Sequence, residues 1–393
     1  MPAVRQTCRC VRILLVNKFA HVTGGADQHC LDLAAALTDA GHEVRMLSTS
    51  DPANGWHAGA FIPVSTTAGT RDQTRLLAAA PVFVGALWHR AAAAAMRRLA
   101  AEFRPDVVHV HKLYPQISVA PVVEADRLGL PVVQTLHDFE MMSANHLDPR
   151  AGRLDLQESR LRYRALNSAT FPIRRKVQLP RVRRFIAVSD VAAAAHRRHG
   201  IDPVVIRNFA PAPPAEVPGW AQRGGALYLG RLAEAKGVRD VIELARVAPD
   251  VPVDVVGFGE LGDELARAAH EVPNLTYHGR VPREETVRHL LAARVALMPS
   301  RAPEGGPLVA LQAMALGTPV VAYDAGGLGE YVRRGGGDVV EPGAESLAVA
   351  VRGLLGDEGG WQEKSAHGRR TVEAEHTPSA YVARLQRIYA SVA

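Results

Sequence analysis

The chain has 393 residues, which is long for one hydrophobic core and suits two domains of ordinary size. Hydrophobic residues make up 47% and charged residues 22%, as in a soluble globular protein. No run of about 18 apolar residues occurs, so no membrane-spanning helix is predicted. Cys8, Cys10 and Cys30 form neither a disulfide framework nor a zinc spacing, and the N-terminal VRILLV run is too short for a secretion signal. These features favour the cytoplasm.

The net charge of +6 is concentrated in the first half of the chain. Residues 1–206 contain 26 Lys and Arg against 17 Asp and Glu, with clusters at 174–176 and 181–184. Nucleic acid is a poor explanation, because aromatic residues are few and no binding motif accompanies the charge. An anionic acceptor or an anionic lipid surface would fit such a face, but we favour a basic face that is simply solvated.

The first half opens with a predicted strand, a glycine turn and a helix. Residues 11–16 are an apolar run typical of a buried parallel strand, and apolar residues recur at helical spacing over 26–40. The next strand is predicted at 43–47. The turn holds Gly24 and Gly25, but GGADQH is not the G-x-G-x-x-G dinucleotide fingerprint. A tight turn and a ligand contact both remain open for these glycines.

Polar side chains mark the ends of two further strands, predicted at 107–110 and 132–136. Alternating strands and helices indicate a parallel, doubly wound sheet, which binds ligands beyond the carboxyl ends of its strands. His109 and His111 lie at the first of these ends, and His137 and Asp138 follow the second. We interpret His109 and His111 as packing residues, since no carboxylate completes a metal site.

The pattern loosens between residues 141 and 184, where we expect acceptor-recognition loops. Strands resume at 185–189 and 204–206. The proline-rich segment APAPPAEVP at 210–218 should be extended and semi-rigid, and it is the best candidate for a domain boundary.

The second half repeats the alternation, with strands predicted at 226–229, 253–256, 275–278 and 338–340. Arg231 follows the first of these strands, and Lys236 lies at the start of the next helix. Two fixed cations beside a helix N-terminus can stabilise a departing diphosphate, a task that many sugar transferases give to a metal ion. The chain holds no Asp-x-Asp pair, which agrees with a metal-free mechanism.

The stretch 297–330 predicts a site for a sugar phosphate. It combines a strand end, a loop with Glu304, Gly305 and Gly306, and a helix opened by Pro307. The free amides and positive dipole end of a helix N-terminus bind anions, and glycines let a ligand approach the backbone. A carboxylate beside phosphate is repelled unless it accepts hydrogen bonds from sugar hydroxyls, so Glu304 indicates a sugar joined to the phosphate.

These residues resemble the signature of the retaining GT-B glycosyltransferases of family 4. The resemblance lies in the Pro-Ser strand end, Glu304, the G-T-P-V-V run and the G-G-x-x-E turn. In that family the first glutamate holds the donor sugar, and an acidic residue eight positions later holds the ribose; here Gln312 stands at that position. T-L-H-D at 135–138 resembles the segment whose histidine lies near the reacting sugar. G-R-L followed by K-G matches the family's two cations.

The resemblance implies an α/β protein of GT-B architecture, with two Rossmann-like, doubly wound domains facing a central cleft. The implied divisions are an acceptor-side domain at 1–209, a donor-binding domain at 210–372 and a terminal helix at 373–393 that packs back toward the first domain. The implied catalytic residues are His137, Glu304, Arg231 and Lys236. The implied donor-binding residues are Gly24, Gly25, Gly257, Gly259, Arg280, Val281, Gly306, Pro307, Leu308, Val309 and Gln312. No metal ligand and no cofactor is expected.

The implied activity is metal-independent transfer of a hexose from a nucleotide-sugar, with a UDP-sugar favoured, to an acceptor hydroxyl with retention of anomeric configuration. The acceptor would be a carbohydrate, a small molecule or a lipid-linked group, and nucleic acid is not expected as a partner. We expect a cytoplasmic protein, with peripheral contact at the inner membrane face through the basic half as an option. Two alternatives stay open: a nucleotide-sugar epimerase of the same fold, and a non-catalytic sugar-nucleotide-binding partner, for which Gln312 is the positive argument.

Overall fold

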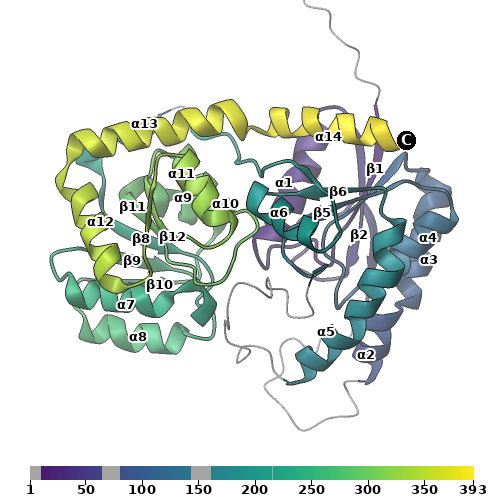
Figure 1. Ribbon diagram of the computed structural model, residues 1–393, viewed down its shortest axis with the longest axis horizontal. Coiled ribbons are helices and arrows are strands. Elements are labelled where there is room, and N and C mark those ends of the chain that lie inside the picture. The colour runs from purple at the N-terminus through teal and green to yellow at the C-terminus, as the bar shows by residue number, and fades with distance from the viewer. Residues whose placement is uncertain (1–9, 64–79, 143–160, 215) are drawn as a thin grey trace, which may run out of the picture.

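The computed structural model describes residues 10–63, 80–142, 161–214 and 216–393. These residues form two parallel sheets that lie side by side along the long axis of the molecule, with helices packed around each (Figure 1). The predicted α/β architecture with two doubly wound sheets is confirmed.

The first sheet has seven parallel strands in the order β3-β2-β1-β4-β5-β6-β7. Its strands are β1 (Arg12–Val16), β2 (Glu43–Thr49), β3 (Gly59–Ile62), β4 (Val107–Val110), β5 (Val132–Leu136), β6 (Arg184–Ala187) and β7 (Val204–Val205). The helices of this half are α1 (Gly25–Asp39), α2 (Ala80–Leu87), α3 (Arg90–Phe103), α4 (Ala120–Arg127), α5 (Leu161–Ile173) and α6 (Asp190–Arg198). The strand order reverses between β1 and β4, and ligands bind at such switch points in open α/β sheets.

The second sheet has six parallel strands in the order β10-β9-β8-β11-β12-β13. Its strands are β8 (Gly224–Leu229), β9 (Val253–Val256), β10 (Leu275–Gly279), β11 (Ala293–Met298), β12 (Val320–Tyr323) and β13 (Asp338–Val340). The helices that follow in this half are α7 (Val238–Val247), α8 (Gly262–Glu271), α9 (Arg283–Ala292), α10 (Leu308–Ala315), α11 (Gly327–Arg334), α12 (Ala344–Gly356), α13 (Glu358–Glu375) and α14 (Pro378–Val392).

The strands are apolar on both faces because both faces of each sheet are covered. In β1, Leu14 and Val16 belong to one core cluster, while Ile13 and Leu15 belong to another on the opposite face. This arrangement follows from the alternation of side chains along a strand. It leaves the carboxyl ends of the strands as the places where polar side chains can gather.

The last helix returns to the first half of the chain. Helix α14 packs against α1 (Figure 1), and Tyr381, Leu385 and Tyr389 share a core cluster with Leu33 and Leu37 of α1. We keep the division into 1–209, 210–372 and 373–393 as a proposal, in which the packing of α14 supports the assignment of the third segment. Within the described ranges, no helix is long and apolar enough to cross a membrane.

Two expectations for the first half need correction. Strand β3 was not among the predicted elements, and the segment 141–184 is not irregular throughout. Residues 143–160 lie outside the described ranges, but α5 begins at Leu161 and continues through a π-helical turn, Arg174–Gln178, and a 3-10 turn, Leu179–Arg181. The polar and basic residues between 161 and 181 therefore lie on helical turns.

The basic cluster at 174–176 is not a uniformly solvated face. Arg174 is fully buried, with its guanidinium 4.9 Å from the ring centroid of Tyr114 and 5.8 Å from that of Phe171. It also donates a hydrogen bond to Thr170 Oγ1 at 3.0 Å. A guanidinium is weakly hydrated and stacks on aromatic rings, which explains how it is accommodated inside the protein. Lys176 is exposed, as expected.

Candidate active site

A loop of the second half reaches the carboxyl ends of β5 and β6 in the first. A Cβ atom on Gly305 would lie 2.4 Å from the carbonyl oxygen of His137, and one on Gly306 would lie 2.7 Å from Asn208 Nδ2. Asn208 Nδ2 donates to the Gly306 carbonyl at 3.0 Å. Because real Cβ atoms do not approach a backbone atom this closely, Gly305 requires glycine, whereas a side chain at Gly306 would have to displace Asn208. The loop therefore brings the residue that follows Glu304 against the backbone of His137.

Glu304 is held by an ion pair and by its own backbone. Its Oε1 lies 2.9 Å from Lys236 Nζ, and its carbonyl accepts from the Gly327 amide at 2.7 Å. Burial would raise the pKa of the Glu304 carboxyl, but Lys236, a hydrogen bond from Ser300 and the charge of Arg231 together bring that pKa below its ordinary value. Glu304 is thus an anion and a hydrogen-bond acceptor at neutral pH.

Three strand-end turns of the second sheet pack on one another near this pair. The Gly257 amide donates to the Gly279 carbonyl at 2.9 Å, and a Cβ on Gly257 would lie 1.8 Å from the carbonyl oxygen of Gly230. Likewise, a Cβ on Gly259 would lie 2.2 Å from the carbonyl oxygen of Leu232. The turns that follow β8, β9 and β10 are therefore brought together, as predicted.

The arginine side chains on these turns are open to solvent. Arg231 and Arg280 are exposed, and Val281 is half-buried. The Arg280 guanidinium lies 4.6 Å from the ring centroid of Phe258, which is itself 46% exposed. A planar, exposed aromatic ring with a cation over it is a surface on which a flat ligand can stack.

Helix α10 begins one residue later than predicted and contains Gln312. Pro307 is the N-cap, Leu308 is the first helical residue, and Gln312 is the fifth residue of the helix. At 3.6 residues per turn Gln312 lies little more than one turn into α10. Its side chain, like that of Val309, is partly exposed, and it has no hydrogen-bond partner among the described residues.

The glycine turn of the first half approaches this helix. A Cβ on Gly25 would lie 3.8 Å from Leu308 Cδ1, which brings the two predicted donor-binding segments together across the two halves of the chain. Gly24 has an extended backbone, with φ of −176°, and a Cβ there would meet nothing within 4 Å. The backbone of Gly24 therefore does not itself require glycine.

The side chains of His137 and Asp138 contact those of His111 and Lys112, the two residues that follow β4. His137 Nε2 and His111 Nδ1 lie 2.8 Å apart, and Lys112 forms an ion pair with Asp138. Burial, followed by the charges of nearby His29 and Lys112, lowers the pKa of His137 well below its ordinary value. His137 is therefore a neutral imidazole at physiological pH.

Sequence reasoning did not identify His111 and Lys112 as site residues. Both directly follow a parallel strand adjacent to β5, and their positions match those of His137 and Asp138 after β5. The adjacency of β4 and β5 was the available signal, but it does not set the register that pairs the two histidines. His109 is fully buried between Tyr389 and Thr135, in agreement with its interpretation as a packing residue.

Glu330 of the G-G-x-x-E turn contacts the first half of the chain. Arg207 Nε donates to Glu330 Oε1 at 2.8 Å, and the amide of Val191 donates to Oε2 at 3.1 Å. Asp32 and Arg283 form a second ion pair between the halves at 3.0 Å. These contacts join the two halves of the chain.

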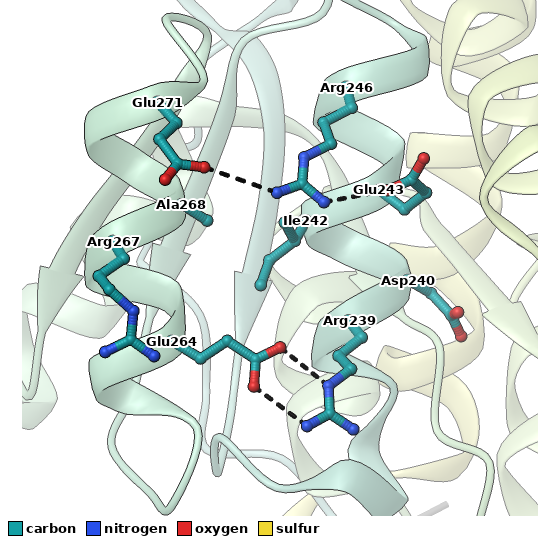
Figure 2. Close-up of a pocket in the computed structure, with 9 residues that line it drawn as sticks. All are labelled: Arg239, Asp240, Ile242, Glu243, Arg246, Glu264, Arg267, Ala268 and Glu271. Atoms are coloured by element: carbon teal, nitrogen blue, oxygen red, sulfur yellow. Dashed lines mark hydrogen bonds and ion pairs between the residues drawn. The ribbon is translucent and has the colours of Figure 1, made fainter.

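Another groove lies on the surface between α7 and α8, with a volume of about 410 Å³ (Figure 2). Most of its charged residues pair with one another: Arg239 Nε lies 2.8 Å from Glu264 Oε1, and Arg246 contacts both Glu243 and Glu271. We do not regard this groove as a candidate site. Among the described residues, no group of three or more His, Cys, Asp or Glu side chains is arranged to hold a metal ion.

Comparisons with known families match both halves of the chain. The model of Glycosyltransferase Family 4 matches residues 23–212, and that of Glycosyl transferases group 1 matches residues 222–371. Glycogen synthase of Mycobacterium tuberculosis is 29% identical, over 93% of this chain and 91% of that protein. Phosphatidyl-myo-inositol mannosyltransferase of Mycolicibacterium smegmatis is 28% identical, over 94% and 91%.

Solved structures share the fold over almost the whole chain. Sucrose-phosphate synthase from Thermosynechococcus elongatus superposes with a TM-score of 0.71 at 21% identity, over 97% of this chain and 98% of that one. Anabaena HepE in complex with UDP-glucose gives a TM-score of 0.70 at 17% identity, over 97% and 100%.

The fold and the arrangement at the strand ends define a glycosyltransferase of the GT-B type, which transfers a sugar from a nucleotide-sugar. The chain belongs to the Glycosyl transferases group 1, family 4. The predicted family and enzyme class are confirmed.

Proposed function

We propose that this glycosyltransferase moves a hexosyl unit from a UDP-sugar to an acceptor hydroxyl, with retention of anomeric configuration and without a metal ion. The observation that carries the proposal is the Lys236–Glu304 ion pair at 2.9 Å, with Arg231 close enough to influence the Glu304 carboxylate. Two cations suited to a diphosphate thus lie beside a carboxylate suited to sugar hydroxyls. In a nucleotide-sugar, the diphosphate and the sugar are joined directly.

In this proposal the protein supplies the charge that a departing diphosphate needs. Arg231, Lys236 and the free amides at the start of α10 stabilise the developing negative charge. Glu304, an anion at neutral pH, accepts hydrogen bonds from hydroxyls of the donor sugar. His137 positions the reacting sugar or hydroxyl from the other half of the chain, and Gly24 and Gly25 lie over the phosphates.

The proposed identity of the donor rests on likeness of fold. The Anabaena protein HepE binds UDP-glucose, as its structure is described, and this favours UDP-sugars by likeness of fold. The turns at Gly257, Gly259, Arg280 and Val281 would line the base, and Gln312 would face the ribose. Retention is supported by the resemblance of the 297–330 stretch to retaining family members.

Two other functions remain as alternatives, and each is separated from transfer by one assay. An epimerase would change the donor sugar without an acceptor, and a non-catalytic partner would bind donor without turnover. We would incubate the protein with isotope-labelled UDP-sugars and GDP-sugars, together with simple glycoside acceptors, and analyse the products by NMR. A new glycoside with the donor's anomeric configuration supports the proposal, whereas an inverted product, an epimerised donor or an unchanged donor contradicts it.

A further inference from the structure

His111 and His137 share one hydrogen bond, and its direction decides which nitrogen of His137 carries a proton. The two residues follow the neighbouring parallel strands β4 and β5, with His111 Nδ1 2.8 Å from His137 Nε2. Their ring planes are inclined by 22°, with centroids 5.1 Å apart. Between two neutral imidazoles, one nitrogen donates and the other accepts.

Both rings are neutral at physiological pH. Burial is the largest cause that lowers the pKa of each, and the surrounding His29 and His109 lower it further. Lys112 also lowers the pKa of His137, while Asp138 acts in the opposite direction without reversing the shift. His109 does not compete for the shared bond, because its two ring nitrogens face the hydroxyls of Tyr389 and Thr135.

The second ring nitrogen of His111 sets the direction of the bond. His111 Nε2 is fully enclosed and has no hydrogen-bond partner among the described residues. A proton on Nε2 would leave a buried N–H without an acceptor, whereas a proton on Nδ1 leaves only a lone pair without a donor. Buried N–H groups without acceptors are rare and costly compared with unused lone pairs. Nδ1 of His111 therefore carries the proton and donates to His137 Nε2.

This direction assigns the role of the second ring nitrogen of His137, Nδ1. Its Nε2 accepts from His111, so the single proton of neutral His137 sits on Nδ1, which has no hydrogen-bond partner among the described residues and is not one of their fully enclosed, unpartnered atoms. We propose that His111 is a positioning residue that fixes the tautomer of His137, so that His137 Nδ1–H donates a hydrogen bond to an oxygen of the bound nucleotide-sugar. The inference rests on the proposed function, in which His137 borders the donor. In this tautomer His137 orients the sugar and cannot take a proton from the acceptor hydroxyl.

The tautomer can be observed directly in the full-length protein. Two-bond ¹H–¹⁵N correlation spectra of ¹⁵N-histidine-labelled protein at neutral pH distinguish the two neutral forms, and the His137 pattern is the one lost in His137→Asn. We expect a protonated Nδ1 and an unprotonated Nε2. A protonated Nε2, or a doubly protonated ring, would overturn the proposal. The spectrum decides this even if no donor is turned over, so failure of the proposed function and failure of this inference are distinguishable.

Two substitutions at His111 test its positioning role. In His111→Asn an amide N–H replaces Nδ1, so the Nδ1–H pattern of His137 and most of the activity should persist. In His111→Leu the hydrogen bond to His137 is lost. We expect kcat to fall about tenfold, the scale of one well-placed hydrogen bond, with little change in the KM for the nucleotide-sugar. Equal kcat values for the two variants would contradict the role. Thermal unfolding checks that both variants fold, and if His111→Leu does not, the wild-type and His111→Asn spectra still decide.

Discussion

Lys236 and Glu304 form an ion pair, with 2.9 Å between Nζ and Oε1, that joins the turn after β8 to the loop before α10. Both side chains are partly exposed, at 29% and 22%, so a ligand can reach either. In the proposed function, the Lys236 cation of this pair faces the diphosphate and the Glu304 anion faces the sugar.

Removing the cation should slow transfer strongly. Lys236→Ala is expected to lower kcat by about 10² to 10³, the scale for loss of one preorganised group that stabilises a departing charge. Lys364→Ala is the matched control, because Lys364 also forms a 2.8 Å ion pair, with Asp338. Steady-state kinetics of both variants check this, and equal rates would remove Lys236 from the site.

Gly305 should not tolerate even a methyl group. In Gly305→Ala the new Cβ would lie 2.4 Å from the His137 carbonyl, so the loop must move away from the first half. We expect a loss of kcat/KM of about 10²-fold, since displacements of about 1 Å have effects of this size. Gly353→Ala in α12 is the control, because a Cβ there meets nothing within 4 Å and alanine favours the helix by up to about 1 kcal/mol. A fully active Gly305→Ala enzyme would show that the two halves need not meet at this loop.

Gln312 should affect donor affinity more than turnover. A glutamine keeps one acceptor for the ribose, and charge-assisted bonds from a glutamate are about twice as strong. We expect Gln312→Ala to raise donor KM several-fold, or by about 1 kcal/mol, and Gln312→Glu to preserve or tighten binding. Loss of kcat at unchanged KM in Gln312→Ala would exclude the ribose role. If Gln312→Glu transferred sugar and the wild-type chain did not, the wild-type chain would be a non-catalytic sugar-nucleotide-binding partner.

The buried histidines predict loss of stability in mild acid. Burial lowers the pKa of His29 and His109 to about 3, whereas an unfolded chain has a value near 6.5. Between these values the unfolded chain binds more protons than the folded one, so the free energy of unfolding falls as pH falls. Each such histidine contributes a slope of up to about 1.4 kcal/mol per pH unit.

Denaturant unfolding at about pH 7.5 and about pH 5 measures this slope. His109→Gln should flatten it, because the group that takes up a proton on unfolding is gone. An equal slope in wild type and His109→Gln would show that His109 titrates normally in the folded protein.

Local patterns were enough to predict the parallel sheets and the grouping of the second-half turns. Strand ends with glycines converge at one edge of a parallel sheet, so Arg231, Lys236 and Glu304 could be placed together from their positions alone. The pairing of His111 with His137 depends on register between strands, which the run lengths do not fix.

Contacts distant in sequence were beyond such reasoning. The partners Arg207 and Glu330 are 123 residues apart, and nothing local to either indicates the other. The burial of Arg174 likewise depends on the ring of Tyr114, 60 positions earlier in the numbering. Without knowledge of such a partner, a cluster of basic residues is predicted to be solvated.

The most direct test of the proposed mechanism is sugar transfer measured in the presence of excess chelator. If Arg231, Lys236 and the amides at the start of α10 stabilise the departing diphosphate, dialysed protein with EDTA should transfer sugar at its full rate, and Arg231→Ala and Lys236→Ala should be slow with or without Mg²⁺ or Mn²⁺. Activity that disappears with EDTA and returns with either ion would contradict the mechanism.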